Sequence, residues 1–401
     1  MSTIARVLAD PAVTKLFEIL DGAGEETRIA GGAVRDALLG RMPAEIDFAT
    51  TAVPDETVRR ASAAGLKTAP TGIAHGTVTV IIDKRPYEVT TLRRDVETDG
   101  RHAVVAFGRD WAEDAKRRDF TINGLFLDRA GTIHDFVGGE EDLKARRVRF
   151  IGDATTRIRE DYLRVLRFFR FFAGYAEGAP DAEAFSAAVT QRHGLDHLSR
   201  ERIRAELLKF LVAPRAAEAA KIMSDAGLLG QILGGMARPR RLARLIEIGG
   251  GADAVMRLGA LALFIPENTE RLRERLRLSN EEAARLRAMA GRPVITPALS
   301  ENDRKGALYR LRPCAFRDRV RLAWADSGAG GDDAAWRALM ALPDEWTPPK
   351  FPVSAASLME RGVEQGPRLG ATLAAIEEEW IAAGFPQDNA ALDRLISAAT
   401  A

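Results

Sequence analysis

The pattern of hydrophobic and polar positions changes once along the chain. In residues 1–138, short apolar runs bounded by turn residues predict strands at 27–30, 45–51, 76–83, 85–93, 121–128 and 132–138. A helical pattern at 33–39 follows the first of these strands. From residue 140 to the end, apolar positions recur every three or four residues, which is typical of amphipathic helices. The chain is therefore predicted to have a small α/β head followed by a long helical region.

The predicted strands of the head occur in consecutive pairs. Segments 76–83 and 85–93 are separated by a turn at Asp83-Lys84 and predict a β-hairpin, and segments 121–128 and 132–138 predict a second pair. Consecutive hairpins among few helices favour an antiparallel or mixed sheet over a doubly wound one. The predicted fold class is therefore α+β.

Composition excludes several classes of protein and leaves the partners open. The 58 Lys and Arg residues nearly balance 57 Asp and Glu residues, so the net charge of +1 indicates no particular partner. The single cysteine, Cys314, excludes a disulfide framework and favours a reducing compartment. Charged residues interrupt the N-terminal segment, and no apolar run approaches the ~20 residues of a membrane span. We therefore expect a cytoplasmic protein that does not interact with a membrane.

Two acidic residues, Glu45 and Asp47, stand two positions apart in an apolar segment. In a strand such residues project from the same face, and two neighbouring carboxylates repel unless a cation neutralises them. Oxygen-only ligands select a hard ion such as Mg²⁺. Glu88, on the neighbouring predicted strand, adds a third carboxylate, and such a group can hold two metal ions for a phosphoryl displacement. The segment predicts a metal site, with a solvated strand face as the alternative.

Gly31 and Gly32 lie where a predicted strand meets a predicted helix. Backbone N–H groups at a helix start favour a phosphate, and glycine lets it approach closely. Arg35, in the first helical turn, can reach the same phosphate. A simple turn would also explain the glycines. Combined with the carboxylate pair, however, these residues predict a site for a metal-bound triphosphate.

An ordered series of motifs resembles the tRNA nucleotidyltransferase/poly(A) polymerase family, the class II branch of the polymerase-β-like nucleotidyltransferases. GGAVRD and EIDFATTAVPDE resemble its first motif, RRDFTINGLFLD its ribose-reading motif, and REDYLRVLRFFRF its base-recognition helix. GGEEDLKARRVRFIGD resembles the hinge segment and RIRAELLKFL the helix that braces the recognition helix. The similarity is dense as far as Leu211 and patchy beyond it. The family most often has Asp where this chain has Glu45, and Glu is also an Mg²⁺ ligand.

The resemblance implies an organisation and a reaction. A polymerase-β-like nucleotidyltransferase head (1–138) would be followed by an all-helical neck that recognises the base (139–211), a body (212–300) and a tRNA-binding tail (301–401). The implied reaction adds C, C and A to the 3′ end of tRNA from CTP and ATP with Mg²⁺, releasing pyrophosphate. Basic clusters at 238–244 and 271–277 would contact the RNA backbone or form solvated helix faces. The sequence does not indicate an oligomeric state.

The ribose-reading motif contributes three candidate nucleotide-binding residues, Arg118, Asp119 and Asn123. Asp119 can accept hydrogen bonds from ribose hydroxyls, while Arg118 can pair with a phosphate or a base. The resemblance implies that these residues select ribonucleotides. An ordinary surface Arg-Asp pair is the alternative.

Four charged residues recur every three positions in the base-recognition motif: Asp161, Arg164, Arg167 and Arg170. They are expected to line one side of a helix, where three arginines indicate an anionic ligand. Asp161 and Arg164 offer an acceptor and a donor that can meet the Watson–Crick edges of C or A but not of U or G. The resemblance implies that these side chains take the place of a nucleic-acid template.

Three other functions remain open at this point. A poly(A) polymerase is closest in sequence, but the long basic C-terminal extension often seen in the bacterial enzymes is missing here. A CC-adding or A-adding partial enzyme is the second, although the segment 94–110, which predicts a mobile loop, resembles the loop that permits a switch from C to A. The third is a non-catalytic tRNA-binding protein, which retention of Glu45, Asp47, Arg118, Asp161 and Arg164 opposes.

Overall fold

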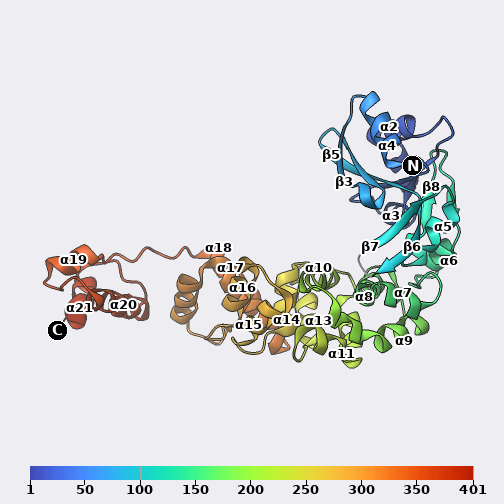
Figure 1. Ribbon diagram of the computed structural model, residues 1–401. Helices are drawn as coiled ribbons and strands as arrows, with labels where there is room; N and C mark the ends of the chain where they lie inside the picture. Colours follow the sequence, from blue (N-terminus) through green and yellow to red (C-terminus); the bar gives the residue numbers. More distant parts are fainter. Residues whose placement is uncertain (100–101, 401) are drawn as a thin grey trace. The chain divides into compact units, whose positions relative to one another are not determined.

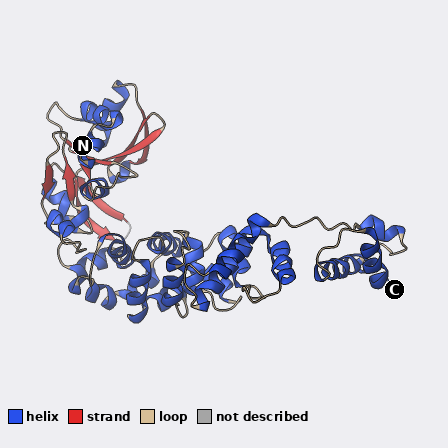
Figure 2. Cartoon of the chain, turned by 180° about the vertical axis from the view of Figure 1, so that it is seen from behind, coloured by secondary structure: helices blue, strands red, loops and turns tan. Residues whose placement is uncertain are grey.

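The computed structural model describes residues 1–99 and 102–400. Their contacts divide the chain into two units, Met1–Leu228 and Leu229–Ala401. All the described strands lie in the first unit, and the second is helical (Figure 2). The predicted change from a mixed head to a helical remainder is confirmed.

A seven-stranded mixed sheet forms the centre of the head (Figure 1). Its strand order is β3-β4-β5-β2-β1-β8-β9, and β2 and β5 pair in parallel while the other neighbours are antiparallel. The predicted hairpin is confirmed, since β4 and β5 pair on either side of Asp83 and Lys84, which have φ angles of 48° and 65°. The strands are β1 (Thr27–Ala30), β2 (Asp47–Thr50), β3 (Lys67–Gly72), β4 (Thr77–Ile82), β5 (Arg85–Thr91), β8 (Leu125–Leu127) and β9 (Ile133–Asp135).

Helices cover both faces of this sheet. Alternate residues of β2 point to opposite faces, and their apolar side chains pack against a helix on each. Phe48 packs edge-on against Phe17 of α2, and its neighbour Ala49 belongs to a cluster with Trp111 of α5. Polar side chains at the strand ends are therefore left to line the site. The helical segments of the head are α1 (Thr3–Leu8), α2 (Pro11–Leu20), α3 (Gly32–Leu38), α4 (Pro54–Ala63), η1 (Ile73–His75), α5 (Trp111–Lys116) and η2 (Thr121–Asn123).

Most of segment 94–110, expected to be a mobile loop, belongs to a separate antiparallel pair, β6 (Arg93–Asp99) and β7 (His102–Phe107). The register shifts between Asp95 and Glu97, as at a β-bulge. The sequence did not indicate these strands because a short hairpin with one bulge lacks a regular alternation. The mobility of the segment stays a prediction. The dipeptide Asp99-Gly100, a turn signal in the sequence, lies partly outside the described residues.

The neck helices pack around a phenylalanine-rich face of α8, where Phe168 lies near Phe120 of the head and stacks with Phe150 of the neck. The motif REDYLRVLRFFRF, expected to form one helix, is instead broken at Asp161, which has an extended backbone (φ −154°, ψ 106°). The helical segments here are α6 (Gly139–Lys144), α7 (Ala154–Glu160), α8 (Leu163–Tyr175), α9 (Ala182–Thr190), η3 (Arg192–His197), α10 (Arg200–Leu211) and α11 (Ala216–Asp225).

The second unit is built on aromatic clusters, including stacked Trp324 and Trp336 and a fully buried Trp380. None of the described helices is both long and apolar enough to cross a membrane. After α12 (Leu228–Leu233), which begins at the unit boundary, its helices are α13 (Pro239–Glu247), α14 (Ala254–Ala262), α15 (Asn268–Leu276), α16 (Asn280–Ala290), α17 (Glu301–Ser327), α18 (Ala334–Glu345), α19 (Ala355–Glu360), α20 (Pro367–Ala382) and α21 (Asn389–Thr400).

The basic cluster expected at 238–244 is largely engaged within the protein. Arg241 is 7% exposed and donates to the carbonyls of Gly259, Ala260 and Leu263 at the end of α14. Arg238 pairs with Asp326 at 2.8 Å. These contacts stabilise helix ends and leave less of the cluster for RNA than its sequence suggests.

Candidate active site

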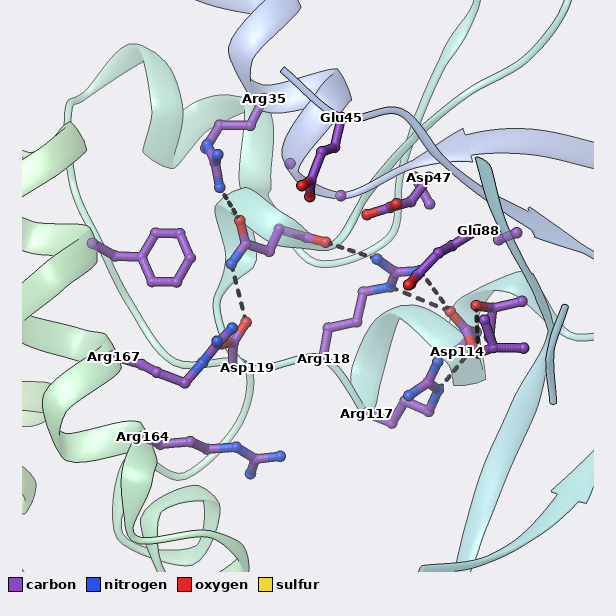
Figure 3. Close-up of a pocket in the computed structure, with 18 of the residues that line it drawn as sticks. Arg35, Glu45, Asp47, Glu88, Asp114, Arg117, Arg118, Asp119, Arg164 and Arg167 are labelled. Atoms are coloured by element: carbon purple, nitrogen blue, oxygen red, sulfur yellow. Dashed lines mark hydrogen bonds and ion pairs between the residues drawn. The ribbon is translucent and has the colours of Figure 1, made fainter. Parts of the chain in front are cut away.

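One cavity of about 760 Å³ in the first unit is lined by all the residues predicted to be catalytic or to bind the nucleotide or metal (Figure 3). Its walls come from the strand ends of the head and from α8 and α10 of the neck. Folding therefore brings together residues that are more than a hundred positions apart. The candidates in the lining are Gly31, Gly32, Arg35, Glu45, Asp47, Glu88, Arg118, Asp119, Asn123, Asp161, Arg164, Arg167 and Arg170.

The three carboxylates lie along one wall of this cavity (Figure 3). Asp47 is the first residue of β2, whereas Glu45 lies in the bend before it, so the strand begins two residues later than predicted. β5 pairs in parallel with β2, with Phe48 opposite Val89, which brings Glu88 beside Asp47. Although their segment is apolar in sequence, Glu45 and Asp47 are both exposed.

The surroundings of Asp47 disfavour its charged form. Desolvation inside the cavity, followed by the nearby Glu88 and Glu45 carboxylates, raises the pKa of Asp47 to about 6, against the opposing effect of Arg118. Among the described residues, no group of three or more His, Cys, Asp or Glu side chains encloses a metal position. The wall thus offers carboxylate oxygens that repel one another, and such donors fit Mg²⁺ with its remaining ligands from water or substrate.

Arg118 faces these carboxylates from the end of α5. It pairs with Asp114 at 3.1 Å and donates to the backbone oxygen of Asn123 at 3.3 Å. A Cβ at Gly31, which has a φ of 66°, would lie 2.9 Å from the Arg118 guanidinium. Gly31 is therefore required both by its backbone conformation and by the close approach of Arg118.

Arg35 is held by protein groups on several sides. Its guanidinium donates to Asn123 Oδ1 and to the Tyr175 hydroxyl, both at 2.6 Å, and it lies 4.0 Å from the centre of the Tyr175 ring. The residue is only 6% exposed. Because Tyr175 is the last residue of α8, Arg35 connects the head to the neck in addition to lining the cavity.

Asp119 forms a second connection between head and neck. It accepts hydrogen bonds from Asn123 Nδ2 at 3.1 Å and from Arg167 Nε at 2.7 Å. Burial would raise the pKa of Asp119, but the charge of Arg167 and the donated hydrogen bonds hold it below its usual value. The carboxylate is therefore ionised and fixed, with η2 rather than a strand supplying Asn123.

Asp161 and Arg164, the residues expected to recognise the base, are each held by a neighbour. Asp161 Oδ2 accepts from Arg202 of α10 at 2.7 Å, and Arg164 donates to the Arg157 carbonyl at 2.7 Å and to Glu160. Asp161 lies in the break before α8, so the four charged residues do not form a row on one helix as predicted. Arg170, farther along α8, pairs with Glu206 at 2.6 Å.

Sequence reasoning missed three groups that organise this cavity: Asp114, Arg202 and Tyr175. Asp114 is 1% exposed and pairs with both Arg117 and Arg118. Its spacing of three and four residues from two arginines was a usable signal. Arg202 and Tyr175 act through contacts across the fold, for which the sequence gave no local signal.

A wall of carboxylates that faces a wall of arginines across a nucleotide-sized cavity suits the transfer of a phosphate-bearing group with a divalent metal. These features define a nucleotidyltransferase. Two family models match the chain: "Poly A polymerase head domain" over residues 27–149 and "Probable RNA and SrmB- binding site of polymerase A" over residues 179–238.

Similar proteins extend the match to most of the chain. It is 35% identical to a mouse protein named CCA tRNA nucleotidyltransferase 1, mitochondrial, with 95% of this chain and 88% of that protein covered. It is 33% identical to a CCA-adding enzyme of Streptococcus sanguinis, with 93% of each covered. The crystal structure of the Bacillus stearothermophilus CCA-adding enzyme in complex with CTP superposes with a TM-score of 0.77 at 27% identity, covering 99% of this chain and 98% of that one.

The chain therefore belongs to the CCA tRNA nucleotidyltransferase family. It is an RNA nucleotidyltransferase, and use of a divalent metal is general in this family.

Proposed function

We propose that this protein adds C, C and A to the 3′ end of tRNA, using CTP and ATP and releasing pyrophosphate. The observation that carries the proposal is the single cavity in which the carboxylates of the head face Asp161 and Arg164 of the neck. This arrangement allows one bound nucleotide to contact both the reactive wall and the base-reading wall. Relatives that are named for CCA addition and match nearly the whole chain support the same reaction.

Glu45 and Asp47 would hold Mg²⁺, with Glu88 beside them. When bound, Mg²⁺ would supply positive charge that activates the tRNA 3′-hydroxyl and neutralises the triphosphate. The carboxylates serve this role only when ionised, so the raised pKa of Asp47 makes metal binding sensitive to pH. No side chain needs to form a covalent intermediate, because positioning and charge neutralisation account for the catalysis.

The remaining candidates would bind the nucleotide. Arg118 lies close enough to Asp47 to oppose the rise in its pKa, a position that suits contact with the triphosphate. Asp119 is ionised and rigidly held, and it retains acceptor capacity for ribose hydroxyls. Arg164 supplies donors to a base edge and Asp161 an acceptor once the base enters. We assign Gly31, Gly32, Arg35, Asn123, Arg167 and Arg170 to the support of this nucleotide.

We further propose that residues 1–138 catalyse, 139–211 select the nucleotide, and 212–300 and 301–401 form a body and a tRNA-binding tail. In residues 212–401, arginines that are not engaged in ion pairs within the protein would contact the RNA backbone. The cytoplasmic location expected from the sequence stays a prediction, since similar proteins include one named as mitochondrial.

The test is to incubate the protein with tRNA ending before CCA, at C, at CC, or complete, supplying each nucleotide separately with Mg²⁺. Sequencing of the products should show C added twice, A added once, and no extension of complete tRNA. Repeated A addition would instead identify a poly(A) polymerase, and arrest at CC a partial enzyme. Tight tRNA binding without any incorporation would support a non-catalytic protein.

A further inference from the structure

A short segment of the neck packs against the break between α7 and α8 in which Asp161 lies. This segment, residues 191–202, includes η3 and the start of α10. It contains one cavity-lining residue, Arg202, whereas Gly194 and Tyr162 are not part of the cavity lining.

Gly194 lies directly against the ring of Tyr162, the residue that follows Asp161. A Cβ built on Gly194 would lie 1.9 Å from Cδ1 and 2.1 Å from Cγ of that ring. Gly194 does not have a positive φ, so its backbone conformation would accept any L residue. Glycine is needed here only because a side chain would collide with the Tyr162 ring. His193 and His197 flank the same ring, with centroid distances of 5.9 Å and 6.3 Å.

The same segment also contacts two of the three residues before Tyr162, namely Asp161 and Arg159. Arg202 donates to Asp161 Oδ2 at 2.7 Å, and Gln191 accepts from Arg159 of α7 at 3.3 Å. Asp161 in turn accepts the backbone N–H of Leu163 at 3.1 Å, which ties it to the start of α8. Residues 191–202 thus hold the turn that contains Asp161 in position.

We propose that Gly194 is a positioning residue for nucleotide selection, since its bare backbone seats Tyr162 and thereby fixes Asp161 and Arg164. The inference rests on the proposed function and extends it to a residue that does not touch the nucleotide. A side chain at this position would have to displace the ring by about 1.5 Å to restore an ordinary 3.4 Å contact. A displacement of about 1 Å is enough to impair hydrogen-bonded alignment severely.

The test compares Gly194→Ala with Gly174→Ala, a matched control in α8 whose added Cβ would meet nothing within 4 Å. The kcat/KM values for CTP and UTP are measured on tRNA lacking CCA, and those for ATP and GTP on tRNA ending in CC. We expect both selectivity ratios to fall about tenfold or more in Gly194→Ala and to be unchanged in Gly174→Ala. Incorporation of C should persist, because the carboxylate wall is untouched.

Tyr162→Ala and the double variant show whether the effect acts through the ring. Tyr162→Ala should lose selectivity as well, and adding Gly194→Ala to it should cause no further loss, because the collision is then absent. Additive losses in the double variant, or an equal fall for all four nucleotides in Gly194→Ala, would overturn the proposal. If Gly194→Ala does not fold, unchanged selectivity in a folded Tyr162→Ala protein would overturn it equally.

The wild-type protein separates this inference from the proposed function. A wild type that adds neither C nor A refutes the proposed function. A selective wild type whose selectivity survives Gly194→Ala refutes the positioning role alone.

Discussion

Replacing Glu88 by Gln should move the pH dependence of catalysis to lower pH without changing its form. The pKa of Asp47 is about 6 because of desolvation first, then Glu88 and Glu45. With that value, the carboxylate is about 90% ionised at pH 7 and about 10% ionised at pH 5. The Mg²⁺ concentration that half-activates C addition should therefore rise about tenfold between these pH values, since only the ionised form binds metal.

The size of the shift in Glu88→Gln follows from the order of the causes. The pKa of Asp47 is raised from 3.8 to about 6, and Glu88 is the second cause after desolvation. Removing its charge should therefore lower the midpoint by about 1 pH unit or less. The assay is a single-turnover C addition on tRNA lacking CCA, titrated with Mg²⁺ at half-unit steps from pH 5 to 8.

The variant also separates the enzyme from its substrate. Protonation of the CTP phosphates weakens Mg²⁺ binding in the same pH range, but it is identical for wild type and variant. A midpoint that stays in place in Glu88→Gln would show that Glu88 does not raise the pKa of Asp47. A half-activating concentration that is flat from pH 5 to 7 in the wild type would refute the reasoning altogether.

Four further predictions concern single groups. Asp47→Asn should abolish nucleotide incorporation, yet above pH 6 the variant should resist urea better than the wild type. A carboxyl group whose pKa is raised in the folded protein destabilises the fold as pH rises from 3.8 to 6, and this loss of stability is complete above pH 6. Asp161→Ala should weaken discrimination against UTP and GTP by about 1–3 kcal/mol in relative kcat/KM, and equal losses for all four nucleotides would contradict the template role. Asp114→Ala should lower the free energy of unfolding by about 3–5 kcal/mol in urea titrations, since it leaves two part-buried arginines unpaired; Glu113→Ala, in an exposed pair, is the control and should cost under about 1 kcal/mol. Deleting residues 98–103 should leave C addition intact and stop the product at CC, and near-normal completion of CCA would remove the segment from the switch.

Local sequence patterns predicted most of the head but not how its strands associate. The hairpin at Asp83-Lys84 was predictable because two adjacent residues in a left-handed conformation close a tight turn between alternating runs. The expected position of Glu88 on a strand beside that of Asp47 is confirmed by the pairing of β2 with β5, but the parallel direction of this pair was not predicted, because no residue near Phe48 encodes it. The break at Asp161 was hidden in a helical pattern, and contacts with Arg202 and Leu163 favour it over a continuous helix.

The candidate site was predictable to the extent that its chemistry lies in contiguous motifs. Glu45 and Asp47 stood out by spacing, and the resemblance supplied Asp161 and Arg164. The groups that hold them, such as Arg202 behind Asp161, were missed because their partners are set by tertiary packing. For Arg35 the prediction was incomplete in another way. It was expected only to reach a phosphate, whereas its guanidinium also donates hydrogen bonds to Asn123 and Tyr175.

The spread of the cavity lining along the chain has a consequence during synthesis. The carboxylates at positions 45, 47 and 88 leave the ribosome well before the base-reading turn at 161 and its support at 202. A nascent head can complete its sheet with β9, ending at Asp135, while the wall proposed to discriminate between bases is still unmade. A chain arrested between these two points would carry the carboxylates proposed to bind metal without the residues proposed to select the base. On this proposal, nucleotide selection requires synthesis to continue past the start of α10.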